Sequence, residues 1–153
     1  MNIKEKIEHD LKEAMKAKEE LRLSVLRMIS AALHNKEIEK RGRGMSAELG
    51  EEEIIAVLRS EAKKRREAEE GFEKGSRPEF ARKEREEMKI VETYLPAELP
   101  DEDLERIVSE VIAAAGEVAE NDFGRIMGEV MKRVKGQATG DRVSGFVRKY
   151  LKK

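Results

Sequence analysis

Residues 122–151 read DFGRIMGEVMKRVKGQATGDRVSGFVRKYL and predict two short amphipathic helices joined by a tight turn around Gly136. From residue 122 to the end, nine Lys and Arg stand against three Asp and Glu, whereas the whole chain has a net charge of −1. A polyanion would therefore be attracted to this end of the chain.

The first of these helices has one apolar arc, with exposed-backbone and basic positions beside it. Its apolar positions are Phe123, Ile126, Met127, Val130 and Val134. We expect Asp122 to cap its start and Gly136 to follow its end. Gly124 and Gly128 lie beside the arc, and a glycine inside a helix costs about 1 kcal/mol relative to alanine. Their spacing indicates close approach by a neighbouring helix, which the geometry favours, or by a nucleic-acid backbone.

The second helix opens at Thr139, Gly140 and Asp141. Its core positions are Val143, Phe146, Val147, Tyr150 and Leu151. The turn formed by residues 135–139 lies before a helix N-terminus, where backbone N–H groups favour anions. Basic faces on short helices are often only solvated surface, so the pattern alone does not assign RNA binding.

The composition is that of a long-helix protein. The chain has 153 residues, of which 42% are charged and 4% aromatic, with no Trp and no Cys. The absence of cysteine excludes disulfides, thiolate nucleophiles and cysteine-ligated metal sites. The N-terminal residues lack the apolar core of a signal peptide, and no apolar run approaches membrane-spanning length. We therefore expect a soluble, cytoplasmic protein.

Helical periodicity predicts an N-terminal domain over residues 1–96. Helices are expected over residues 3–16 and from Glu19, followed by a loop that begins in the charged segment 36–43 and contains Gly42, Gly44 and Gly50. We interpret this loop as a solvated connection rather than a binding loop.

A long antiparallel hairpin is expected over residues 51–95. Its first helix turns polar on all sides at Lys63-Lys64-Arg65-Arg66, and Pro78 suits the first turn of its second helix. The basic run is either a phosphate site or a surface neutralised by the neighbouring glutamates, and the second interpretation is favoured.

Two prolines, Pro96 and Pro100, predict the break before a C-terminal domain over residues 97–153. Asp101 is expected to cap the next helix, which Gly116 can end. Residues 97–121 contain eight acids and one base, so this domain combines one acidic helix with two basic ones. The predicted fold is all-α: an N-terminal helical domain with a long hairpin, followed by a small three-helix domain.

The motif F-G-x-I-M-G-x-V-M-x-x-V-K-G-x-A at 123–138, followed by V-x-x-F-V, resembles the YqeY family. The segments at 16–33, 61–67 and 94–96 are also similar to that family, so the resemblance covers nearly the whole chain. The last 55 or so residues resemble the C-terminal tail of GatB, a subunit of the glutamine-dependent aspartyl/glutamyl-tRNA amidotransferase. The resemblance implies a three-helix tail that, in GatB, helps to hold tRNA.

The residues expected to contact RNA are the basic residues and three glycines of the C-terminal pair of helices. They are Gly124, Arg125, Gly128, Lys132, Arg133, Lys135, Gly136, Arg142, Arg148 and Lys149.

No catalytic group can be assigned. His9 and His34 lack any metal-binding pattern, no serine lies in a nucleophile elbow, and there is no P-loop or dinucleotide motif. No cofactor and no metal are expected, and whether the protein is an enzyme stays open.

Three functions remain. The first is a non-catalytic accessory protein that binds tRNA. The second is a protein–protein adaptor that uses the 51–95 hairpin. The third is a component of an amidotransferase, which would need a catalytic partner subunit.

Overall fold

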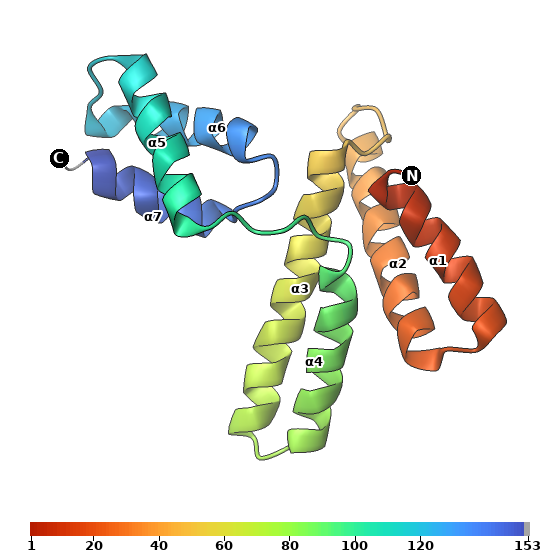
Figure 1. The fold of residues 1–153 in the computed structure, drawn as a ribbon. Coiled ribbons are helices and arrows are strands. Elements are labelled where there is room, and N and C mark those ends of the chain that lie inside the picture. Colours follow the sequence, from red (N-terminus) through yellow and green to blue (C-terminus); the bar gives the residue numbers. More distant parts are fainter. Residues whose placement is uncertain (152–153) are drawn as a thin grey trace. The chain divides into compact units, whose positions relative to one another are not determined.

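A computed structural model of the chain describes residues 1–151. Within these residues the fold is all-α, as predicted, and contains no strand. The elements in chain order are α1 (Ile3–Ala17), α2 (Glu20–Gly42), α3 (Glu51–Lys74), α4 (Pro78–Glu92), α5 (Asp101–Ala115), the short 3₁₀ helix η1 (Glu120–Asp122), α6 (Phe123–Val134) and α7 (Gly140–Leu151). Figure 1 shows their arrangement.

The chain divides into two compact units, Met1–Leu95 and Pro96–Lys153. Two domains with a boundary between residues 96 and 97 stay a prediction. Each unit has a hydrophobic core of its own.

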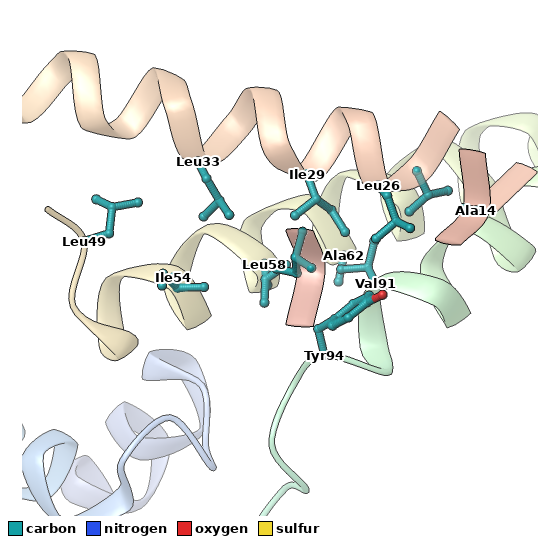
Figure 2. Packing of buried hydrophobic residues seen from close by; sticks show 12 residues of the cluster. Ala14, Leu26, Ile29, Leu33, Leu49, Ile54, Leu58, Ala62, Val91 and Tyr94 are labelled. Atoms are coloured by element: carbon teal, nitrogen blue, oxygen red, sulfur yellow. The ribbon is translucent and has the colours of Figure 1, made fainter. Parts of the chain in front are cut away.

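The core of the N-terminal unit forms where α2 meets α3 and the end of α4. Leu26, Ile29 and Leu33 of α2 point toward Leu58 of α3, and Val91 of α4 closes the cluster (Figure 2). These side chains are almost completely buried because α2 carries a wide apolar arc, which makes it the centre of this unit.

A polar cluster fixes the end of α4 to α1 and α2. The hydroxyl of Tyr94, a residue only 6% exposed, donates a hydrogen bond of 2.6 Å to Asp10 Oδ2. The guanidinium of Arg22 lies 3.4 Å from the same carboxylate oxygen. Burial raises the pKa of Tyr94 to about 12, and the hydrogen bond to Asp10 acts in the same direction.

The pKa of Asp10 shifts in the opposite direction. Burial by itself raises the pKa of its carboxyl, but the hydrogen bonds from Tyr94 and His9 and the charge of Arg22 bring the pKa below its ordinary value. The ionised carboxylate is therefore the form that the folded chain stabilises.

The α3–α4 hairpin is held by hydrophobic contacts near its base and by ion pairs farther out. Helices α3 and α4 run side by side over the length of α4, while the first part of α3 extends beyond it (Figure 1). Arg85 of α4 donates to Glu69 and Glu73 of α3 at 2.7 and 2.9 Å. At the tip, the rings of Phe72 and Phe80 lie 5.3 Å apart. The polar outer half of α3 is thus matched by charges on α4.

The basic run at 63–66 is partly neutralised. Arg65 lies 3.4 Å from both Glu84 and Glu87, and Lys64 lies 3.1 Å from Glu61. These two cations are paired as the neutralised-surface interpretation predicts, whereas Lys63 and Arg66 are exposed.

The loop between α2 and α3 comprises residues 43–50, close to the loop predicted from Gly42, Gly44 and Gly50. Helix α2 continues through the charged segment to Gly42. The ammonium of Lys40 donates to the Glu48 carbonyl at 2.6 Å and to Glu53 Oε1 at 2.8 Å. The cation holds the loop against the end of α2.

The cap predicted at Asp101 is wrong, whereas Asp122 occupies the N-cap position of α6 as predicted but makes no side-chain hydrogen bond to that helix. Asp101 is the first residue of α5 after Pro100, and its carboxylate accepts from Arg142 instead of from the helix backbone. Asp122 precedes α6, but its Oδ2 accepts from the Ala119 N–H at 2.9 Å. The side chain therefore closes η1, which continues directly into α6.

The C-terminal unit packs α5, α6 and α7 around a valine-rich core. Its fully buried side chains include Leu104, Val108, Ile126, Val130 and Val143. Gly116 ends α5 with φ +78, as predicted.

Replacing Tyr94 by Phe tests the polar cluster. We expect the N-terminal unit to lose about 1–3 kcal/mol of stability, because Asp10 loses a charge-assisted hydrogen bond in a largely buried place. Because the pKa of Tyr94 is raised from 10 to about 12 on folding, its contribution is complete below pH 10 and is lost as the pH rises through about 12.

Thermal unfolding followed by circular dichroism measures this effect. The melting temperatures of the wild type and Tyr94→Phe should differ at neutral pH and converge between pH 10 and 12. A constant difference over this range would contradict the assignment. A double-mutant cycle with Asp10→Asn isolates the pair.

Candidate nucleic-acid interface

Helix α6 buries one side and leaves the other open. Ile126, Val130 and Val134 are at most 1% exposed and face the core of the C-terminal unit. On the 3.6-residue repeat the opposite side forms a continuous strip. We call it the α6 outer face, and its exposed members are Gly124, Arg125, Gly128, Glu129, Met131, Lys132 and Lys135, the last at the helix C-cap.

The two glycines of this face do not serve helix packing. An added Cβ at Gly124 or Gly128 would have no atom within 4 Å. The favoured expectation, close approach by a neighbouring helix, is therefore wrong within the described part of the chain. The reason is rotational: both positions lie outside the buried arc, on a flank that no other helix covers within 4 Å, so they leave bare helix backbone on the surface.

The cations of the α6 outer face are accessible. The side chains of Arg125 and Lys132 are 57% and 74% exposed. Their partners are one turn away on the same helix, Asp122 at 3.3 Å and Glu129 at 3.5 Å. Such exposed pairs contribute only about 0.2–1 kcal/mol and are readily exchanged for another anion. Lys135 forms no ion pair with any of residues 1–151.

Arg148 adds a fourth exposed cation from α7. Its guanidinium lies 5.2 Å from the centre of the Phe123 ring at the start of α6. A cation over an aromatic face is attracted to the ring while its N–H groups stay available to solvent or an anion.

The remaining three predicted cations face acidic α5 and the segment before it. Arg133 donates to Glu110 at 2.5 Å, and Lys149 donates to Glu105 at 3.3 Å. We use the name α5 seam for three contacts with acids of α5: Arg133 with Glu110, Arg142 with Asp101 and Lys149 with Glu105. The structure thus divides the basic residues by their partners: these three pair across helices, and of them only Arg142 is largely withdrawn from solvent, since the side chains of Arg133 and Lys149 are 45% and 57% exposed.

Arg142 has more partners than the other two cations of the α5 seam. Its Nη2 donates at 2.8 Å to both the Leu99 carbonyl and Asp101 Oδ1, and its Nη1 lies 3.7 Å from Glu98. The side chain is only 26% exposed. Arg142 therefore ties the extended segment before α5 to the start of α7.

Polar groups of the turn between α6 and α7 are hydrogen-bonded within the C-terminal unit. Lys135 and Gly136 have φ values of +49 and +78, so Gly136 follows the helix end as predicted and Lys135 is left-handed as well. Thr139 Oγ1 accepts from the Arg142 N–H at 3.3 Å, and the Gln137 carbonyl accepts from the Leu99 N–H at 2.7 Å. With this cap and Asp141 in its first turn, the α7 N-terminus is a poorer anion site than its sequence indicates.

Sequence reasoning missed this division, although a signal for it exists. Asp101 and Glu105 are one turn apart on α5, and Arg142 and Lys149 are two turns apart on α7. Charges at such spacing lie on one side of each helix and can face each other. The buried turn residue Ala138, only 2% exposed, was missed as well.

The histidines and carboxylates form no recognisable metal centre. In the described part of the chain, no group of three or more His, Cys, Asp or Glu is placed to hold a metal ion. The side chains of His9 and His34 are 55% and 66% exposed, as expected for surface histidines. Among the same residues, no helix combines the length and apolar character needed to cross a membrane.

The family model described as "Yqey-like protein" matches residues 4–151. The chain belongs to the YqeY family. The resemblance inferred from the helical motifs is thereby confirmed.

One curated relative is the "Altered inheritance of mitochondria protein 41, mitochondrial" of Eremothecium gossypii. It is 32% identical over 91 residues, which is 60% of this chain and 48% of the relative. This YqeY-family chain therefore spans about half the length of the curated relative that it matches. The name places that relative in mitochondria.

Replacing Arg142 by Ala tests whether this cation stabilises the C-terminal unit more than an accessible cation does. We expect the C-terminal unit to lose about 1–2 kcal/mol of stability, since two charge-assisted hydrogen bonds of a partly exposed side chain disappear. Lys135→Ala is the matched control and should change stability by less than about 0.5 kcal/mol.

Amide hydrogen exchange of Val143 and Val147 in the full chain reports the opening free energy of this unit. Equal protection in the two variants would show that Arg142 has no structural part in the α5 seam.

Proposed function

We propose that this protein is a non-catalytic accessory factor that binds tRNA through the α6 outer face and Arg148. The observation that carries the proposal is the division of the cations. Arg125, Lys132 and Lys135 are exposed on the face of α6 that carries bare helix backbone, and Arg148 is exposed on α7, while the other predicted cations pair with α5 and the segment before it. The likeness of this unit to the GatB tail supports tRNA as the ligand.

Binding of this kind is mainly electrostatic. Each cation that neutralises a phosphate releases condensed counterions, so the affinity falls with salt. Four contacts correspond to a loss of about a hundredfold between about 50 and 200 mM salt. Accessible cations also attract the ligand from a distance, although the chain as a whole has a net charge of −1.

The charge-reversal variant Lys132→Glu/Lys135→Glu tests the proposal. We expect its affinity for a tRNA transcript to fall by about tenfold or more, and the slope of log K against log salt to decrease by about 2. Fluorescence anisotropy titrations of the full-length protein at about 50 and 200 mM salt measure both quantities.

The control is Lys63→Glu/Arg66→Glu on α3. It removes two exposed cations and makes the same change in net charge. An equal loss of affinity in this variant would contradict the assignment to α6. Absence of tRNA binding by the wild type at low salt would overturn the proposed function itself.

The glycines of the α6 outer face give a second test. Gly124→Ala and Gly128→Ala create no clash, so each should stabilise the helix by about 0.5–1 kcal/mol, with the smaller gain at Gly124 in the first turn. If bare backbone allows close approach by a sugar–phosphate chain, the double variant should bind tRNA several-fold more weakly.

Amide exchange and anisotropy on the same preparation measure the two effects. A more stable protein with unchanged affinity would show that the glycines have no part in binding.

In its wider role, we place the protein beside glutamine-dependent tRNA amidation, in the cytoplasm. The sequence contains no cysteine and no nucleotide-binding motif, so the carbon–nitrogen ligase chemistry would come from a catalytic partner subunit. On this proposal the chain holds the tRNA while the partner carries out the reaction.

A further inference from the structure

The chemistry of the α6 outer face also bears on which part of an RNA it contacts. Resting on the proposed function, we infer that this face holds the sugar–phosphate backbone of base-paired RNA, independently of sequence, and not a single strand.

Aromatic side chains are the first argument. Proteins that hold single strands stack successive bases on exposed aromatic rings, a contact worth about 1–3 kcal/mol per base. The aromatic residues of the C-terminal unit are Phe123, Phe146 and Tyr150, and all three pack partly buried against its core. Arg148 lies over the Phe123 ring. The unit therefore offers unpaired bases no stacking platform.

The α6 outer face also has few side chains of the kinds that read bases. Sequence is read through bidentate contacts, for which Asn, Gln and Arg are the usual donors and acceptors. The α6 outer face has no Asn or Gln, and two of its three cations, Lys132 and Lys135, are point charges that suit phosphate oxygens. Arg125 is exposed and pairs with Asp122 at 3.3 Å, a contact that a phosphate can replace. These groups are better suited to positioning an RNA backbone than to discriminating bases.

The rigidity of the face is the third argument. Arg125 and Lys132 are seven residues apart, which on a helix rise of 1.5 Å per residue is about 10 Å. The buried side of the same helix holds the backbone of these two residues on one line along the helix axis. A duplex presents its phosphates in fixed rows, and A-form RNA is recognised mainly through its backbone and shape. A flexible strand would have to be ordered to match the same line.

The experiment compares labelled RNAs by anisotropy with the full-length protein. The probes are a short loop-free RNA duplex, each of its separated strands, and a second duplex of unrelated sequence, all at about 50 mM salt. We expect the duplex to bind about tenfold more tightly than either strand. The two duplexes should agree within about threefold, since phosphate contacts carry no sequence information. Lys132→Glu/Lys135→Glu should lose the preference for duplex, and Lys63→Glu/Arg66→Glu should keep it.

The outcomes distinguish failure of the duplex inference from failure of the proposed function. Equal or tighter binding of a single strand overturns the duplex inference while leaving RNA binding intact. A strong preference for one duplex sequence overturns sequence independence. Absence of binding to every probe and to tRNA overturns the proposed function.

Discussion

The α5 seam decides what the C-terminal unit can present to a partner. This unit is small, and a small core leaves little stability in reserve. Opposite charges on facing helices supplement the hydrophobic contacts, and Arg142 extends them to the segment before α5. Acids of α5 pair with Arg133, Arg142 and Lys149, whereas Arg125, Lys132 and Lys135 lie on the α6 outer face and Arg148 lies on α7 over Phe123.

The N-terminal unit uses charge for a different purpose. Near the base of the α3–α4 hairpin, apolar side chains of α2 provide the contacts, whereas farther out Arg65 and Arg85 join the two helices through glutamates. Partly exposed ion pairs hold geometry but contribute little net stability. At the tip, Phe80 is 42% exposed and its ring lies 5.3 Å from that of Phe72. Tyr94 and Asp10 fix the opposite end of α4, just before the chain leaves the unit.

Helical periodicity was sufficient to predict most of the fold. The buried sides of α5, α6 and α7 follow the 3-4 spacing of their apolar residues, and Pro78 and Gly116 mark helix ends by the chemistry of their backbones. The cap predicted at Asp101 was wrong because the partner of that side chain is distant in sequence: its carboxylate accepts from Arg142, 41 residues later. A local pattern carries no information on such partners.

The candidate site was predictable in composition but not in arrangement. The basic residues and glycines are evident from the sequence, yet the sequence alone did not divide Arg133 and Lys149 from Lys132 and Lys135. That division depends on the rotation of each helix against α5. The glycines Gly124 and Gly128 were assigned to packing because a neighbour was assumed on their side of the helix, and the structure has none within 4 Å.

At position 135, the residue that would give the most stable backbone differs from the residue that supplies a positive charge. It is held at φ +49, where a residue other than glycine costs about 1–2 kcal/mol. Glycine at this helix end would relieve that strain and remove a cation that has no partner in residues 1–151. Laboratory evolution that selects only for heat resistance would therefore drive this position toward an uncharged residue. Retention of lysine in a natural population would be a sign of selection on the charge and not on the fold.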